Sequence, residues 1–388
     1  MSVKSFLVAA SLALSVIIGL VLRRDSGAVT SAAGAKRRVQ IGLSLDTLKE
    51  ARWAQDRDAF QKRAAELGAD VTVLSANSDD NAQVQDVTSL ITSQVDIIVI
   101  VPHDGKAMAK GVALAHAAGI PVIAYDRLIT DSDPDLYVTF DNRRVGALQA
   151  EFILNQLKGR NKSRPIRLVR IYGSKTDHNA FMFKEGQDEA LKKAVEDGVV
   201  QVLHEDWADD WKPETAKRIM NAALTKYGRD IDAVLASNDG TAGGAIQALR
   251  EEGIAGKVIV TGQDAEIVAC QRILGGEQSM TIYKPVEQLA RQATDVALAM
   301  VKGKPVIATA TTFNGKIAVP SIFHDVVTVT KENLDQTVIA DGFHTRDEIY
   351  GGVGANQAAN GPAGQAGGAG KPAPSGPGAS DQRAAGAK

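Results

Sequence analysis

Short apolar segments alternate with longer amphipathic segments along most of this chain of 388 residues. Each apolar segment is bounded by turn residues, a pattern that predicts a strand buried on both faces, as in a parallel sheet. The predicted strands are 39–45, 71–74, 97–101, 121–125, 166–171, 199–203, 233–236 and 258–261.

The segments between these strands have the spacing of helices with one apolar face. Three such apolar stripes are Phe60, Ala64 and Leu67; Val84, Val87 and Ile91; and Leu289, Val296 and Met300. Gly68, Gly119 and Gly253 follow helical segments where C-caps are expected. Strands that alternate with helices of this length predict a parallel sheet covered by helices on both faces.

The strand series restarts partway along the chain. One set lies within 39–125 and a second within 166–261, which predicts two similar α/β lobes, each with a doubly wound parallel sheet. In open parallel sheets, ligands bind beyond the carboxyl ends of the strands. Two lobes that face each other would therefore form a ligand cleft between these ends.

Both ends of the chain differ in composition from the middle. Residues 1–35 combine a basic start at Lys4, an apolar run over 6–22 and the small-residue sequence AGA at 33–35, which predicts a secretory signal peptide. An uncleaved membrane anchor is the alternative, and either segment puts the folded part outside the cytoplasm, in the periplasm. Residues 351–388 are rich in Gly, Ala and Pro, which predicts a disordered tail.

Composition narrows the classes of function. The formal net charge of −2 offers no basic surface for nucleic acid. Cys270 is the single cysteine, so an internal disulfide is impossible, and the six histidines show no metal-ligand spacing. We expect neither a metal ion nor a cofactor.

Polar side chains that can make several hydrogen bonds follow nearly every predicted strand. These side chains are Asp46, Arg52, Asp126, Arg127, Asp177, Asn179, Ser237, Asn238, Asp239, Gln263, Asp264 and Lys284, and the aromatic candidates are Trp53, Trp207 and Trp211. Carboxylates, amides and guanidinium groups suit the adjacent hydroxyls of a monosaccharide, and an aromatic ring can cover each apolar face of the sugar. Taken singly, a residue such as Asn238 is also a common helix N-cap. The combination with Arg, Lys and Trp favours a sugar site.

With these residues in view, the sequence resembles the periplasmic sugar-binding proteins of ABC transporters. The matching strings are ARW at 51–53, DRD at 56–58, AYDR at 124–127, TFDN at 139–142, WADDW at 207–211, ASND at 236–239, AGGAIQ at 242–247, TGQDA at 261–265, YKP at 283–285 and DGFH at 341–344. They occur in order over about 39–348. Residues 173–179 read GSKTDHN and depart from the family, which has a turn richer in Gly and Pro and an Asn at the position of His178.

The resemblance implies a type I periplasmic binding protein, in which a three-strand hinge joins the lobes. Lobe 1 would comprise 38–139 plus 284–311, and lobe 2 would comprise 140–283 plus 312–349. The resemblance also implies that Trp53 and Trp211 cover the two faces of the sugar and that Trp207 is a supporting core residue. The implied hydrogen-bonding residues are Arg52, Asp126, Arg127, Asp177, Asn179, Asn238, Asp264 and Lys284. The implied ligand is a monosaccharide, most closely a pentose such as D-xylose, and the implied partner is the membrane permease of an ABC transporter. A monomer is expected.

An enzyme would need a catalytic constellation, and no nucleophile elbow or phosphate-binding loop occurs in the sequence. A sugar-responsive transcription regulator would need a helix-turn-helix before lobe 1, where the apolar export segment lies. A protein that presents its sugar to a sensor or chemoreceptor, or that binds another pentose or a hexose, stays open.

Overall fold

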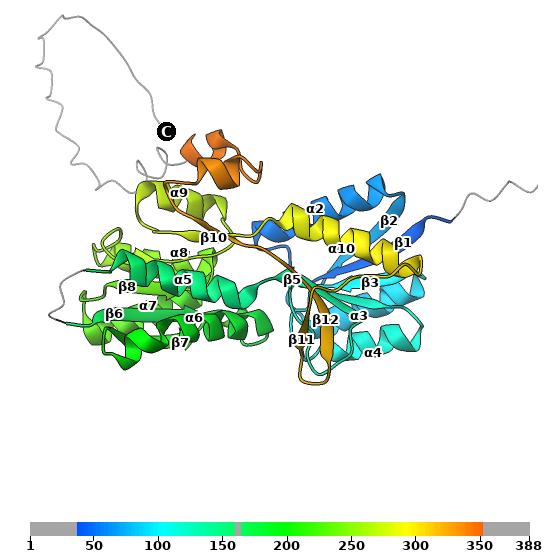
Figure 1. Cartoon of the computed structure of the whole chain (residues 1–388), viewed down its shortest axis with the longest axis horizontal. Helices are drawn as coiled ribbons and strands as arrows, with labels where there is room; N and C mark the ends of the chain where they lie inside the picture. The colour runs from blue at the N-terminus through cyan, green and yellow to red at the C-terminus, as the bar shows by residue number, and fades with distance from the viewer. Residues whose placement is uncertain (1–36, 160–163, 352–388) are drawn as a thin grey trace, which may run out of the picture.

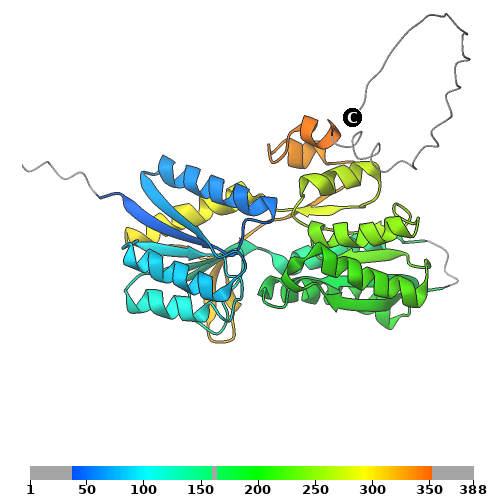
Figure 2. The ribbon, with the colours of Figure 1, turned by 180° about the vertical axis from the view of Figure 1, so that it is seen from behind.

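The computed structural model describes residues 37–159 and 164–351, which form two α/β lobes lying side by side (Figures 1 and 2). The predicted signal peptide at 1–35 and all of the predicted tail at 351–388 except Gly351 lie outside the described residues. Within the described part of the chain, no helix is both long enough and apolar enough to cross a membrane.

Lobe 1 is built on a sheet of seven strands in the order β11-β12-β5-β4-β3-β1-β2. Its strands are β1 (Val39–Leu45), β2 (Ala69–Ser75), β3 (Ile97–Ile100), β4 (Val122–Tyr125), β5 (Leu136–Phe140), β11 (Ala310–Phe313) and β12 (Ala318–His324). Its helices are α2 (Ala51–Glu66), α3 (Asp80–Thr92), α4 (Ala109–Ala117) and α10 (Val286–Val301). The strands run parallel except β11, which pairs antiparallel with β12 at the edge.

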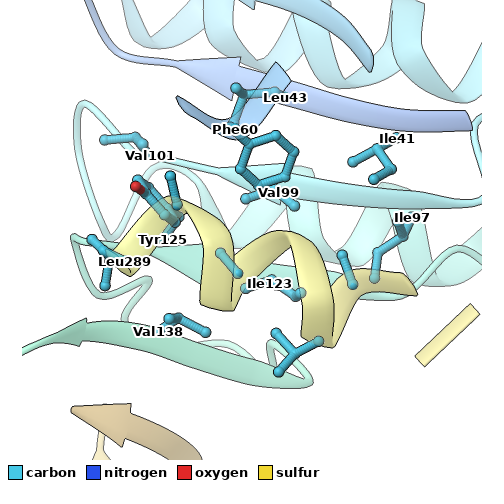
Figure 3. Packing of buried hydrophobic residues seen from close by; sticks show 14 of the residues in the cluster. Ile41, Leu43, Phe60, Ile97, Val99, Val101, Ile123, Tyr125, Val138 and Leu289 are labelled. Atoms are coloured by element: carbon cyan, nitrogen blue, oxygen red, sulfur yellow. The ribbon is translucent and has the colours of Figure 1, made fainter. Parts of the chain in front are cut away.

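The predicted apolar stripes pack onto this sheet from both sides. Phe60 on α2 and Leu289 on α10 contact one face together with Val99 and Ile123 (Figure 3), and all four side chains are buried. Val87 on α3 belongs to the cluster on the opposite face. Helices on both faces confirm the doubly wound arrangement predicted for this lobe.

Lobe 2 repeats the plan on a smaller sheet with strand order β7-β6-β8-β9. Its strands are β6 (Ile166–Tyr172), β7 (Val200–Trp207), β8 (Ala233–Ala236) and β9 (Ile259–Val260), with β10 (Thr281–Tyr283) and β13 (Val327–Val329) paired antiparallel beside them. Its helices are α5 (Asn142–Gln156), α6 (His178–Glu196), α7 (Pro213–Tyr227), α8 (Asp239–Glu251) and α9 (Ile267–Gly275), with short turns η1 (Asp209–Trp211) and η2 (Asp335–Ile339).

The chain passes between the lobes at three places: from β5 to α5, from β10 to α10, and from β12 to β13. The third passage corrects the expected boundary at 311/312, because β12 pairs in parallel with β5 and keeps residues up to His324 in the sheet of lobe 1. In both lobes the carboxyl ends of the parallel strands point toward the other lobe. The loops that follow the strands therefore meet between the lobes.

Candidate ligand-binding site

All ten residues proposed from the sequence line one cavity between the lobes. Lobe 1 contributes Arg52 and Trp53 from the start of α2, and Asp126 and Arg127 from the end of β4. Lobe 2 and the passage from β10 contribute the others, namely Asp177, Asn179, Trp211, Asn238, Asp264 and Lys284. The space between atoms is about 350 Å³, including part of its opening to solvent.

Glu50, Phe183 and Gln263 also line the cavity. The sequence interpretation missed Glu50 and Phe183, and it noted Gln263 after its strand without including it among the ligand contacts. Phe183 lies one helical turn after Asn179 on α6, and Gln263 directly precedes Asp264. Glu50 is the N-cap residue of α2, two positions before Arg52. Each is therefore a near neighbour in sequence of a predicted residue, and helical or loop spacing could have found it.

The guanidinium of Arg52 lies in a carboxylate cluster that spans the two lobes. Within lobe 1, Nη2 donates to Asp126 Oδ2 at 2.9 Å and Nε lies 3.3 Å from Asp56 Oδ2. Nη1 lies 3.5 Å from Asp264 Oδ1 in lobe 2. The guanidinium also lies over the ring of Trp53, with Cζ 4.2 Å from the centroid. These contacts fix the planar group at one wall of the cavity.

Arg127 has a similar arrangement, and its Cζ lies 5.2 Å from the centroid of the same Trp53 ring. Its Nη1 donates to Asp46 Oδ2 at 2.7 Å in lobe 1, and its Nε lies 3.0 Å from Asp177 Oδ2 in lobe 2. His103 Nδ1 lies 3.0 Å from the second oxygen of Asp46. Each arginine is thus held by a carboxylate of its own lobe and also reaches a carboxylate of the other lobe.

Burial and charge oppose each other in the pKa values of these groups. Burial alone would raise the pKa of Asp126, but the positive charges of Arg52, Lys284 and Arg127 outweigh burial and hold that pKa below its usual value. Burial raises the pKa of Asp56, although Arg52 opposes the shift. For Asp177, burial likewise outweighs the attraction of Arg127 and raises the pKa.

Two of the lobe 2 residues combine helix capping with the cavity. Asp177 Oδ1 accepts from Asn179 N at 2.9 Å at the start of α6, which leaves Oδ2 for Arg127. Asn238 Oδ1 accepts from Thr241 N at 2.8 Å at the start of α8, which leaves its amide NH₂ as a donor. The capping role and the ligand role considered for such residues are therefore compatible.

Several polar atoms at the cavity lack a hydrogen-bond partner in the described residues, although they are buried: Asp264 Oδ1, Gln263 Oε1 and Trp211 Nε1. The buried ammonium of Lys284 lies 3.7 Å from Asp264 Oδ1, beyond hydrogen-bond distance. Buried polar atoms without partners cost free energy. Asp264 Oδ1 and Gln263 Oε1 are acceptors, whereas Trp211 Nε1 and the Lys284 ammonium are donors. Because a hydroxyl group both donates and accepts, this set of atoms matches a polyol.

The three tryptophans have different surroundings. Trp53 and Trp211 line the cavity from opposite lobes. Trp211 also packs so closely against Gly173 that a Cβ there would lie 2.0 Å from the indole. Trp207 stacks instead on Tyr172 and Phe181, with centroid distances of 4.9 and 4.6 Å. Trp207 is thus part of an aromatic cluster apart from the cavity.

Two facing α/β lobes with a polar cavity at their strand ends define a solute-binding protein that encloses its ligand. A family model described as "Periplasmic binding protein domain" matches residues 41–305. Among curated proteins, the chain is 43% identical over 326 residues to the D-xylose-binding periplasmic protein of Haemophilus influenzae, covering 84% of this chain and 96% of that protein. It is 42% identical over 321 residues to the protein of the same name from Escherichia coli, covering 83% and 96%.

Among solved structures, an ABC transporter solute binding protein from Clostridium phytofermentans with bound beta-D-glucose superimposes with a TM-score of 0.75. It is 34% identical in sequence, and the match covers 80% of this chain and 99% of that chain. The chain belongs to the periplasmic binding protein family. That family consists of non-enzymatic binding proteins, so this chain is not an enzyme.

Proposed function

We propose that this protein binds one neutral monosaccharide, D-xylose, between its lobes in the periplasm and delivers it to the permease of an ABC transporter. The observation that carries the proposal is the convergence of Arg52, Asp126, Arg127, Asp264 and Lys284 on one buried cavity. The relatives at 42–43% identity that are called D-xylose-binding support the choice of sugar.

In the bound state, the charged side chains would form paired hydrogen bonds with adjacent sugar hydroxyls, and Trp53 and Trp211 would cover the ring faces. Hydrogen bonds to charged groups contribute roughly 1.5–3 kcal/mol each, so a few of them are sufficient for micromolar affinity, about −8 kcal/mol. A sugar that lacks one of these hydroxyls should bind much more weakly, because a charged side chain of the site is then left unpaired.

Binding is coupled to closure of the lobes around the three-strand hinge. The proposed contacts are divided between the lobes, so the full set exists only in the closed form. Direct contacts also join the lobes, including the hydrogen bond from Gly105 N to Thr176 O at 3.1 Å. A ligand shifts a conformational equilibrium only by its differential affinity for the two states. The closed form would present the surface that the permease recognises, and a monomer suffices for this cycle.

Titration calorimetry against D-xylose, D-ribose, L-arabinose, D-glucose and D-galactose tests the ligand. The proposal requires D-xylose to bind most tightly, with one site per chain. Small-angle scattering tests closure: D-xylose should reduce the radius of gyration of the chain. Tightest binding of a hexose would change the assigned sugar, and no binding of any monosaccharide would refute the proposal.

Presentation of the sugar to a sensor is a second candidate. A relative that is 34% identical over 324 residues is called a multiple sugar-binding periplasmic receptor, in Rhizobium radiobacter; the match covers 80% of this chain and 92% of that protein. Co-purification of the sugar-loaded chain with either a permease or a chemoreceptor domain distinguishes the two roles.

A further inference from the structure

Buried hydrogen bonds in lobe 2 converge on Asp239, which does not line the cavity. Its side chain is fully buried at the start of α8. Oδ1 accepts from Gln278 Nε2 at 2.7 Å, and Oδ2 accepts from the hydroxyl of Thr281 at 2.9 Å and from Glu266 N at 3.0 Å. One carboxylate therefore joins α8 to the loop before α9 and to β10.

The loop 262–266 brings Gln263 and Asp264 to the cavity in a strained conformation. Asp264 has a φ of 97° and Ala265 a φ of 51°, in a region that residues other than glycine rarely adopt. Such strain persists only where the surrounding structure fixes the backbone. The conformation of Asp264 therefore needs contacts that hold the neighbouring peptide groups.

Asp239 supplies these contacts on both sides of the strained pair. Glu266 N donates to Asp239 directly, whereas Ala265 N donates at 3.2 Å to the hydroxyl of Thr281, which in turn donates to Asp239. The backbone N–H of Asp239 donates to Gln263 O at 2.9 Å. Both peptide N–H groups that follow Asp264 are thus fixed by Asp239, one of them through Thr281.

The fit around the carboxylate is close. A Cβ on Gly262 would lie 2.0 Å from Asp239 Oδ1 and 2.4 Å from Gln278 Nε2. The loop therefore packs directly onto Asp239, and only glycine is tolerated at position 262. A shift of this carboxylate would be transmitted to the loop because no free space separates them.

Three of the proposed ligand contacts depend on these segments. Asn238 directly precedes Asp239, Asp264 lies on the strained loop, and Lys284 follows β10, which carries Thr281. We propose that Asp239 is a positioning residue for ligand binding, which holds the loop 262–266 and β10 so that Asp264 and Lys284 point into the cavity. This inference rests on the proposed binding of a monosaccharide at that cavity.

The experiment measures D-xylose affinity by titration calorimetry for Asp239→Asn and Thr281→Val. Both variants should bind about 10-fold more weakly or worse. Thr281→Val leaves Ala265 N without its acceptor, and Asp239→Asn replaces one of two acceptor oxygens, both of which accept from protein donors, with an NH₂ group. Thr294→Val is the matched control: Thr294 is also fully buried and donates only within α10, to Ala290 O at 2.7 Å. It should lower the melting temperature without changing the affinity.

A double-mutant cycle separates positioning from general destabilisation. If Thr281→Val acts through Asp264, its effect on affinity should largely disappear in the Asp264→Asn background. Additive effects would overturn the inference, as would wild-type affinity in both Asp239→Asn and Thr281→Val. If Asp239→Asn does not fold, the conservative Thr281→Val variant still decides. Failure of the wild-type chain to bind any monosaccharide would instead refute the proposed function.

Discussion

Arg127 and Asp177 form an ion pair across the cleft, with 3.0 Å between Nε and Oδ2 and with more than nine tenths of each side chain buried. Arg127 stays held in lobe 1 by Asp46, so opening of the cleft separates the guanidinium only from Asp177. The pair therefore contributes to the closed form specifically. A buried ion pair that loses one partner leaves an uncompensated charge.

The first prediction concerns this pair. Asp177→Asn keeps an oxygen that can cap α6 but removes the charge that faces Arg127, so D-xylose affinity should fall roughly 10- to 100-fold, measured by calorimetry. Glu185→Gln on the same helix is the control, because it removes the exposed pair with Arg143. Because exposed ion pairs contribute little to stability, the D-xylose affinity of Glu185→Gln should match that of the wild type. Equal affinities for Asp177→Asn and wild type would contradict the assigned role.

The second prediction separates two tryptophans that lie four positions apart. Trp211→Ala should weaken sugar binding by about 2 kcal/mol or more, because buried aromatic contacts are frequent hot spots. Trp207→Ala should mainly lower the melting temperature, because Trp207 packs on Tyr172 and Phe181. Calorimetry and thermal melts of both variants give the comparison. A larger loss of affinity for Trp207→Ala would mean that the two roles are reversed.

The order of strands and helices could be predicted because each buried parallel strand forms a continuous apolar run. The runs at 39–45 and 233–236 coincide with β1 and β8. In contrast, the edge strand β11 alternates half-buried and exposed residues, with Phe313 69% exposed, and the neighbouring β12 alternates exposed and buried residues over its first half. They have no such run, so the sequence pattern does not show that the chain stays in lobe 1 until the end of β12.

The candidate site could be predicted for a related reason. Parallel strands bring their carboxyl ends to one edge, so side chains such as Asp126 and Asp264, far apart in sequence, converge there. The supporting contacts could not be predicted in the same way. Asp239 looked like part of a helix start, and nothing in the local sequence shows that Thr281 and Glu266 N meet at its carboxylate. Those contacts depend on tertiary packing.

The third prediction concerns pH and His103. The hydrogen bond to Asp46 raises the pKa of His103 above its ordinary value of 6.5. A histidine of this kind stabilises the fold fully below pH 6.5, and the contribution is lost as the pH rises through the raised pKa. The free energy of unfolding lost in His103→Asn should therefore be larger at about pH 5.5 than at about pH 8.5.

His178 serves as a control of opposite sign. Burial lowers the pKa of His178, so its contribution is present above pH 6.5 and is lost as the pH falls. The free energy of unfolding of His178→Asn, relative to that of the wild type, should therefore rise as the pH falls. Denaturant unfolding of wild type and both variants at each pH provides the measurement. Parallel pH profiles of wild type and His103→Asn would show that His103 does not titrate with folding.

The last prediction concerns the charge of the ligand. Around the cavity, the cations Arg52, Arg127 and Lys284 already face the carboxylates Asp126, Asp177 and Asp264 at 2.9–3.7 Å. A ligand carboxylate would enter among acidic groups whose charges these cations already balance. At 4 Å and an effective dielectric constant of 20, two like charges repel by about 4 kcal/mol. Anionic sugars should therefore bind poorly.

D-Xylonate and D-glucuronate should bind at least about 100-fold more weakly than D-xylose near neutral pH, since a 100-fold change in affinity is about 2.7 kcal/mol, less than the repulsion from one carboxylate at 4 Å. Asp264→Asn should narrow the difference between D-xylose and D-xylonate, because it removes one repelling charge. Asp58→Asn, at a position 64% exposed on α2 outside the cavity, should leave the ratio unchanged. Competition titrations measure the ratio for each variant. Binding of D-xylonate within 10-fold of D-xylose by the wild type would mean that Lys284 is free to pair with an anion, contrary to the charge arrangement described.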